Sequence, residues 1–280
     1  VLMGALDWAR LILREDQRAN TGTPVDHLGE VWAVPLAEAR LSTFLAADKQ
    51  NARAGDGEEG PEAFLSGSIE DAQGRYNLAN LKGQEIPQEE KRTVIRLCQS
   101  AGLPSDLAEQ FVQQMNRALN ATGDSSDAPL LPLLISQLSW LNLPPDALRA
   151  LDAWVIILPE QKKPVNINTA PREVLAALFD NMDLATAERV VQKRRSAAYS
   201  DMNLVQIDLH QRDADASALR SRVDVKSDYF LVTGRLRLDE RVVEQRSLVQ
   251  RTDNEVKLVW RERVSPPPGS STHKLSPGAP

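Results

Sequence analysis

The chain has 280 residues, of which 42% are hydrophobic and 26% are charged, and its formal net charge is −6 at pH 7. This composition is that of a globular protein with one large or two small domains. The acidic balance disfavours an extended nucleic-acid interface, because phosphate backbones bind best to clustered positive charge. The single cysteine, Cys98, excludes a disulfide within the chain, and no apolar run is long enough to span a membrane.

The first segment predicts an amphipathic helix that ends near Asn20, before a Thr-Gly-Thr-Pro turn. Its apolar residues occupy more than one face, so one face can pack within the protein and the remainder indicates a partner. The candidate partner-binding residues are Leu2, Leu6, Trp8, Ala9, Ile12 and Leu13. Because the pattern is already under way at residue 1, and no initiator methionine precedes it, we expect the chain to be part of a longer protein.

Two short strands are predicted next, at residues 64–70 and 75–78, with 71–74 between them as a hairpin turn. From residue 87 to residue 212 the apolar spacing is helical almost throughout, with prolines between the segments. The clearest helical segments are 89–100, 105–119, 130–141 and 145–158.

Alternation of apolar and polar residues returns after residue 221 and predicts three more strands, at 229–238, 241–250 and 255–264. Five short strands are too few for two sheets, so we predict an α+β fold in which one antiparallel sheet is interrupted by an inserted all-α domain. The expected boundaries are 1–81 for the first helix and hairpin, 82–215 for the insertion, 216–264 for the remaining strands, and 265–280 for a disordered tail.

The most informative stretch of the insertion is VNINTAPREVLAALFDNMD at 165–183. Asn168 or Thr169 can cap the helix that follows, and Pro171 is tolerated in its first turn. Asp183 can cap a second helix and Ser200 a third. With Asn166, the residues Asn168, Thr169 and Pro171 form the predicted structural motif.

This stretch resembles the helix-hairpin-helix family, in which a similar phrase begins the first helix and a Gly-rich hairpin binds DNA. In such a hairpin, glycines let backbone N–H groups approach a phosphate. Here the hairpin at 179–183 has no glycine and two carboxylates, and the basic run at 193–195 is typical of a solvated helix end. A nucleic-acid-binding protein of the DNA-uptake type is therefore the second hypothesis.

The order of motifs along most of the chain resembles the K class of minor pseudopilins (GspK-like) of bacterial type II secretion systems. The segments that carry this resemblance are WARLILRED at 8–16, GEVWAVP at 29–35, SGSIEDAQGRYNLANL at 66–81, LP at 158–159 and VNINTA at 165–170. It implies the fold described above, in a periplasmic domain anchored to the inner membrane by a preceding helix.

The resemblance also implies a function. Proteins of this class cap the tip of a short pilus-like fibre and help to initiate its assembly, in complex with minor pseudopilins of the I and J classes. The bulky insertion is expected to prevent another subunit from adding above it. The secreted substrate and the outer-membrane secretin are further candidate partners.

Members of this class commonly carry a calcium-binding loop rich in acidic residues. The matching region at 120–129 has only two acids, Asp124 and Asp127, whereas calcium takes six to eight oxygen ligands. We therefore predict no bound metal or other cofactor, with these two residues as the candidate calcium ligands. No catalytic motif occurs and the three histidines lie in unrelated contexts, so we also predict that the protein is not an enzyme.

Overall fold

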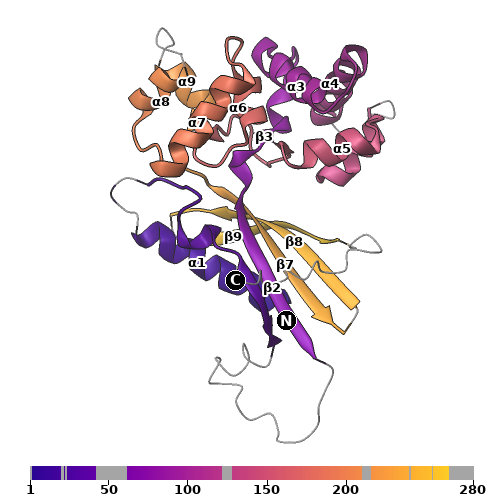
Figure 1. The fold of residues 1–280 in the computed structure, drawn as a ribbon. Helices are drawn as coiled ribbons and strands as arrows, with labels where there is room; N and C mark the ends of the chain where they lie inside the picture. The colour runs from indigo at the N-terminus through magenta and orange to yellow at the C-terminus, as the bar shows by residue number, and fades with distance from the viewer. Residues whose placement is uncertain are drawn as a thin grey trace, which may run out of the picture. The chain divides into compact units, whose positions relative to one another are not determined.

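The protein has an α+β fold that divides into two compact units, seen here in a computed structural model (Figure 1). The structure describes residues 2–19, 22, 24–41, 62–121, 128–209, 216–239, 241–253 and 255–264. The sheet unit comprises Val1–Glu15, Val31–Glu70 and Leu231–Pro280, and the helical unit comprises Asp16–Glu30 and Asp71–Phe230. None of the helices in those ranges has the length and hydrophobicity that crossing a bilayer requires.

The sheet unit is built on one five-stranded sheet with the strand order β1-β2-β7-β8-β9. Its strands are β1 (Leu36–Arg40), β2 (Ala63–Asp71), β7 (Tyr229–Leu238), β8 (Arg241–Arg251) and β9 (Val256–Val264). The pairs β1–β2 and β8–β9 are antiparallel, and β2 and β7 run in opposite directions in Figure 1. Since β2 lies beside β7, the prediction of one sheet interrupted by a helical insertion is confirmed.

Helix α1 (Leu2–Ala19) packs on this sheet. A glycine on β7, Gly234, permits the close approach, because a Cβ added there would lie 3.3 Å from Leu2 Cδ2 and 3.7 Å from Ala5 Cβ. Arg10 of the helix donates from Nε to the Val256 carbonyl of β9 at 2.8 Å. The predicted helix and its end near residue 20 are therefore confirmed.

The helical unit surrounds a separate apolar core that includes Leu97, Phe111, Leu138 and Leu175. Its helices are α3 (Gln88–Ser100), α4 (Ser105–Asn120), η4 (Ile135–Leu141), α5 (Pro145–Asp152), α6 (Arg172–Leu178), α7 (Leu184–Ser196), α8 (Met202–Asp208) and α9 (Ala216–Arg222). Two small parallel pairs join β3 (Tyr76–Asn77) to β4 (Val155–Ile156), and β5 (Val165–Asn166) to β6 (Val223–Asp224).

The predicted hairpin over 64–78 is wrong. Asp71 accepts a hydrogen bond from the Gln73 backbone N–H at 2.8 Å, which turns the chain into the 3₁₀ helix η2 (Ala72–Gly74). The following strand β3 then pairs with β4 in the helical unit, because the Tyr76 N–H donates to the Trp154 carbonyl. Residues 71–81 consequently belong to the helical unit, whereas the sequence placed the insertion boundary at residue 82.

Two predicted helices are also shorter than expected. The segment 130–141 is helical only from Ile135 and forms a 3₁₀ helix, η4. The segment 145–158 ends as a helix at Asp152, after which β4 begins. The strands at 229–238, 241–250 and 255–264 fall within one residue of their predicted bounds. The tail at 265–280 lies outside the described residues.

Candidate partner-binding surface

The apolar residues of α1 separate into a buried set and an exposed set. Leu6, Ala9 and Leu13 are buried within the protein, so the prediction that these three side chains meet a partner is wrong. Each stabilises the protein by packing beneath the helix; for a fully buried leucine this contribution is about 1.5–3 kcal/mol. Leu2 and Ile12 are half-buried, and Trp8 remains 44% exposed. The free apolar face therefore contains only part of the predicted set.

Two exposed apolar residues of α1 were not predicted from the sequence. Met3 is 49% exposed and Leu11 is 44% exposed, and both lie on the solvent side of α1. The helical pattern was recognised from the series Leu2, Leu6, Ala9 and Leu13, most of which packs inside the protein. Met3 and Leu11 do not belong to this series. An exposed leucine in a helix is common in itself, so the sequence alone gave no signal for either residue.

The exposed face of α1 adjoins a shallow apolar groove within the sheet unit. The groove has a volume of about 20 Å³ and runs between Ala5, Trp8 and Ile12 on one side and Trp32 and Val34 on the other. Trp32 is buried in η1 (Val31–Ala33), whereas Val31 and Val34 on either side of it are mostly exposed. The apolar surface thus continues from the helix to the segment before β1, and it is the candidate partner-binding surface.

The predicted structural motif of Asn166, Asn168, Thr169 and Pro171, called here the Asn166 motif, lies in the helical unit. Both Asn166 and Asn168 are buried. Asn168 receives the Tyr199 N–H on Oδ1 at 2.8 Å and donates from Nδ2 to the Tyr199 carbonyl at 2.9 Å. The Thr169 hydroxyl donates to Asp71 at 2.6 Å. The prediction that Asn168 or Thr169 caps α6 is therefore wrong, because both side chains connect segments that are distant in sequence.

The helix caps themselves were partly predicted. Asp183 accepts the Thr186 N–H at 2.7 Å and caps α7, as predicted. Pro171 precedes α6 directly and offers no side-chain cap. The cap of α8 is Asp201, which accepts the Asn203 N–H at 2.8 Å, so the prediction of Ser200 is wrong by one residue.

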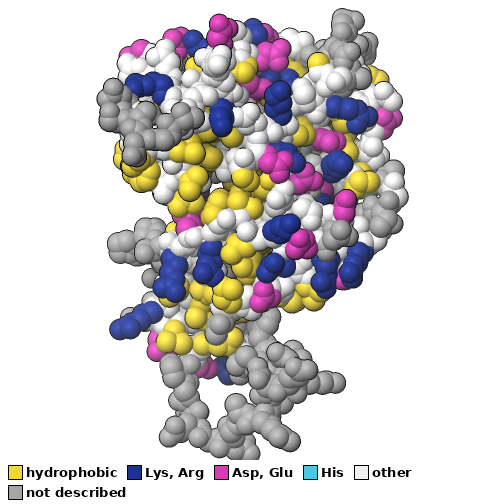
Figure 2. Space-filling view, turned by 180° about the vertical axis from the view of Figure 1, so that it is seen from behind, with side chains coloured by type: hydrophobic (Ala, Val, Ile, Leu, Met, Phe, Trp, Pro, Cys, Tyr) yellow, Lys and Arg dark blue, Asp and Glu magenta, His cyan; other side chains and the backbone are white. Residues whose placement is uncertain are grey.

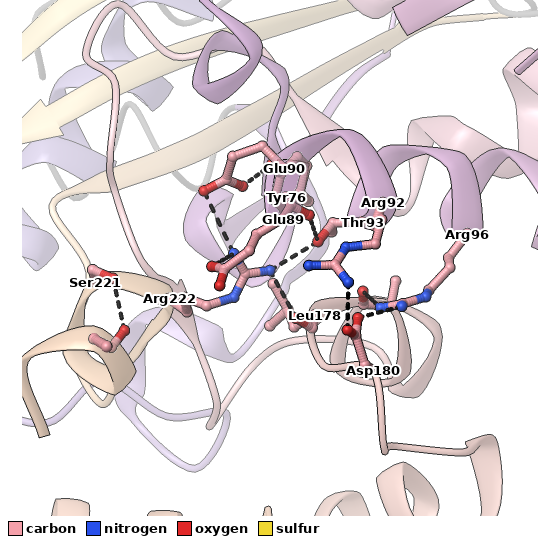
Figure 3. A network of polar contacts seen from close by, with 12 residues as sticks. Tyr76, Glu89, Glu90, Arg92, Thr93, Arg96, Leu178, Asp180, Ser221 and Arg222 are labelled. Carbon is pink, nitrogen blue, oxygen red and sulfur yellow. Dashed lines mark hydrogen bonds and ion pairs between the residues drawn. The ribbon is translucent and has the colours of Figure 1, made fainter. Parts of the chain in front are cut away.

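Side chains of the helical unit bind residues at and beside the hairpin between α6 and α7 (Figure 3), while Asp180, Asn181 and Asp183 themselves remain exposed. Asp180 forms ion pairs with Arg92, at 2.7 Å, and with Arg96, both on α3. Arg96 also donates to the Ala177 carbonyl, and Arg222 donates to the Leu178 carbonyl. A phosphate approaching this hairpin would meet the Asp180 carboxylate, and because the hairpin has no glycine, side chains flank its backbone N–H groups.

The basic run at 193–195 is largely engaged within the helical unit. Lys193 binds Asp208, and Arg194 donates to the Ile167 carbonyl. Burial lowers the pKa of Arg194 to about 10. On the face drawn in Figure 2, Lys and Arg side chains alternate with Asp and Glu over the helical unit, so this face presents no extended basic surface.

The Asp180 pairs lead to a pH-dependent prediction. The hydrogen bond from Arg96 holds the pKa of the Asp180 carboxyl below its usual value of 3.8. A carboxyl with a lowered folded-state pKa stabilises the protein above its unfolded pKa, and this stability is lost as the pH falls through the folded pKa. We expect Asp180→Asn to lower the melting temperature at pH 7 and the difference from wild type to shrink below pH 4. In an Arg96→Gln background the effect should be smaller; an undiminished effect would show that the ion pair is not its cause.

The candidate calcium ligands Asp124 and Asp127 lie outside the described residues, so the absence of bound calcium stays a prediction. Within the described ranges, three carboxylates gather elsewhere, at Asp16, Asp26 and Glu30, with their nearest oxygens within 4.8 Å of one another. Two of these groups are already engaged, because Asp26 accepts the Ser227 N–H and Glu30 accepts the His27 N–H, each at 2.8 Å.

Comparison with known proteins matches the chain to secretion components. Residues 165–226 match the family described as type II secretion system (T2SS), protein K. The chain is 27% identical to the type II secretion system protein K of Pseudomonas aeruginosa PAO1 across 93% of its own length and 78% of the relative's. It is 29% identical to the protein of the same description from Dickeya chrysanthemi, over 41% of this chain and 33% of the relative.

A solved structure shares the fold. The crystal structure of the GspK-GspI-GspJ complex from the enterotoxigenic Escherichia coli type 2 secretion system contains a chain that aligns with a TM-score of 0.70 at 18% identity. The alignment covers 94% of both chains, so it includes both units described above.

Proposed function

We propose, from its similarity to the type II secretion system protein K family, that the chain is a member of this family and acts as a minor pseudopilin at the tip of the pseudopilus. In this role it is a structural, non-catalytic subunit that supports protein export across the outer membrane. The observation that carries the proposal is the exposed apolar face of α1 with its adjoining groove. In an assembled fibre, a neighbouring subunit would bury this apolar surface.

The partners proposed for this surface are the minor pseudopilins of the I and J classes. The structure that shares the fold is a complex of GspK with GspI and GspJ, which makes partners of these two classes the first to test. An apolar helix from such a partner could pack along α1 against the exposed surfaces of Trp8 and Val34. The secreted substrate and the secretin remain further candidates.

The size of the insertion supports the proposed position at the tip. The helical unit spans most of the chain, from Asp71 to Phe230, and is larger than the sheet unit that carries α1. A subunit with an insertion of this size would hinder the addition of another subunit above it. The proposed family membership also supports a periplasmic location, with anchoring to the inner membrane through a helix of the full-length protein.

Co-purification tests this function directly. We expect the chain to co-elute with I- and J-class pseudopilins of the same secretion system in size-exclusion chromatography. It should leave a DNA duplex unshifted in a gel at low salt, since the hairpin has no glycine and presents the Asp180 carboxylate, which already pairs with Arg92 and Arg96. Failure to co-elute with folded partners would remove the main support for the proposal, and a robust DNA shift would favour the helix-hairpin-helix function instead.

A further inference from the structure

A buried polar cluster lies in the helical unit, where the chain leaves the sheet after β2 and returns to it at β7. Asp71 is the last residue of β2, and three donors converge on its Oδ2. The Thr169 hydroxyl donates at 2.6 Å, the Ser227 hydroxyl at 2.7 Å and the Asn166 amide at 2.8 Å. One carboxylate oxygen thus connects the exit of the insertion, its middle and its return.

The side chain of Gln73 also connects the exit of the insertion with its middle and its return. Gln73 accepts the backbone N–H of Asp228 at 2.7 Å and that of Tyr229 at 3.2 Å on its Oε1. Its amide donates to the Pro164 carbonyl at 3.1 Å. Because Tyr229 is the first residue of β7, these bonds act on the residues where that strand begins.

The segment between α1 and η1 joins the cluster as well. Asp26 accepts the Ser227 N–H on Oδ2 at 2.8 Å, and its carbonyl accepts from the Asn166 amide at 3.1 Å. Asp26, Asp71, Asn166 and Ser227 are all buried. Burial raises the pKa of Asp71, and the hydrogen bonds from Thr169 and Ser227 oppose that shift. A buried group with this many partners is costly to disturb, since each loss leaves an unsatisfied donor or acceptor.

The start of β7 needs such a constraint. Tyr229, Phe230, Leu231 and Val232 are all buried, so alternation between a buried and an exposed face does not define how this part of the strand pairs. The partner strand β2 ends at Asp71, and the whole insertion separates it from β7 in the sequence. Bringing strands so far apart in sequence together carries a loop-closure cost that ordered ends of the insertion reduce.

We propose that Asp71, Gln73, Asn166 and Ser227 form a clasp that closes the helical insertion and fixes the start of β7 against the end of β2. The clasp gives the Asn166 motif a role that does not depend on the partners of the secretion system. Apolar packing keeps the helical unit folded, and the clasp determines where that unit returns the chain to the sheet.

Hydrogen exchange measured by mass spectrometry on the full chain tests the clasp. Asp71→Asn would replace one carboxylate oxygen by an N–H₂ group. Both oxygens of Asp71 accept hydrogen bonds, so the N–H₂ group would face a donor in either orientation of the amide. Ser227→Ala removes one hydroxyl and is the milder variant. The matched control is Asp180→Asn, the same substitution at a carboxylate of the helical unit whose partners lie on α3.

We expect amide exchange in β2 and β7 to accelerate at least about tenfold in Asp71→Asn and by a smaller factor in Ser227→Ala. Exchange in α3 and α4 should stay at the wild-type rate in both, and Asp180→Asn should leave β2 and β7 unchanged. Unchanged exchange in β2 and β7, or equal acceleration in the sheet and in α3–α4, would overturn the proposal. If Asp71→Asn does not fold, Ser227→Ala decides by the same criteria.

Discussion

Replacing Trp8 by glutamate is expected to abolish co-elution of the chain with its I- and J-class partners. Trp8 combines a large exposed apolar surface with a position on the rim of the groove. Buried tryptophans are frequent energetic anchors of interfaces, and truncating one commonly costs 2 kcal/mol or more, roughly a 30-fold loss of affinity. Glutamate adds the cost of placing a charge in an apolar contact. Size-exclusion chromatography and calorimetric titration with the purified partners would measure the loss.

The matched control is Trp140→Glu. Trp140 is 52% exposed, close to the 44% of Trp8, but it lies on η4 in the helical unit. The same substitution there should leave co-elution intact if the α1 face is the binding surface. Equal losses in both variants would point to a general effect of charge or folding, and a selective loss in Trp140→Glu would move the binding surface to the helical unit. Circular dichroism would establish that both variants are folded.

The sheet was predictable from sequence because its later strands carry a local signal. In β7 and β8 many apolar residues alternate with arginine or glutamate, as Leu236 and Leu238 do with Arg235 and Arg237. Turn residues separate the strands, so each strand could be delimited without knowledge of its neighbours. The short strands β3 and β5 carry no such signal, since each has two residues and is defined by its pairing with a distant partner.

The Asn166 motif shows where local reasoning fails. Asparagine and threonine before a helix have the chemistry of a cap, and the sequence offers no way to distinguish a cap from a tertiary hydrogen bond. In the structure the Asn166 amide donates to Asp71, 95 residues away in the sequence. The same limit applies to α1, where helical spacing identified Leu6 and Leu13 but could not tell which apolar face the sheet would cover.

Gly67→Ala is expected to destabilise the sheet unit more than any other conservative change in β2. A Cβ at this position would lie 2.8 Å from the Thr233 carbonyl oxygen of β7, closer than real Cβ contacts allow. The obstacle is backbone, so it cannot move aside as a side chain could, and the neighbouring strands β2 and β7 must separate. Overpacking of this kind typically costs about 1–3 kcal/mol. Urea denaturation followed by tryptophan fluorescence would measure the loss in a Trp140→Phe, Trp154→Phe background, in which the three remaining tryptophans lie in the sheet unit.

Gly4→Ala is the matched control, because the same methyl group added at Gly4 meets no atom within 4 Å. Gly4 lies in the exposed part of α1, where alanine is the better helix former, so this variant should gain up to about 0.5–1 kcal/mol. Opposite signs for the two alanines would show that the effect at Gly67 comes from the contact between β2 and β7. A neutral Gly67→Ala would mean that these strands can separate at this position at little cost.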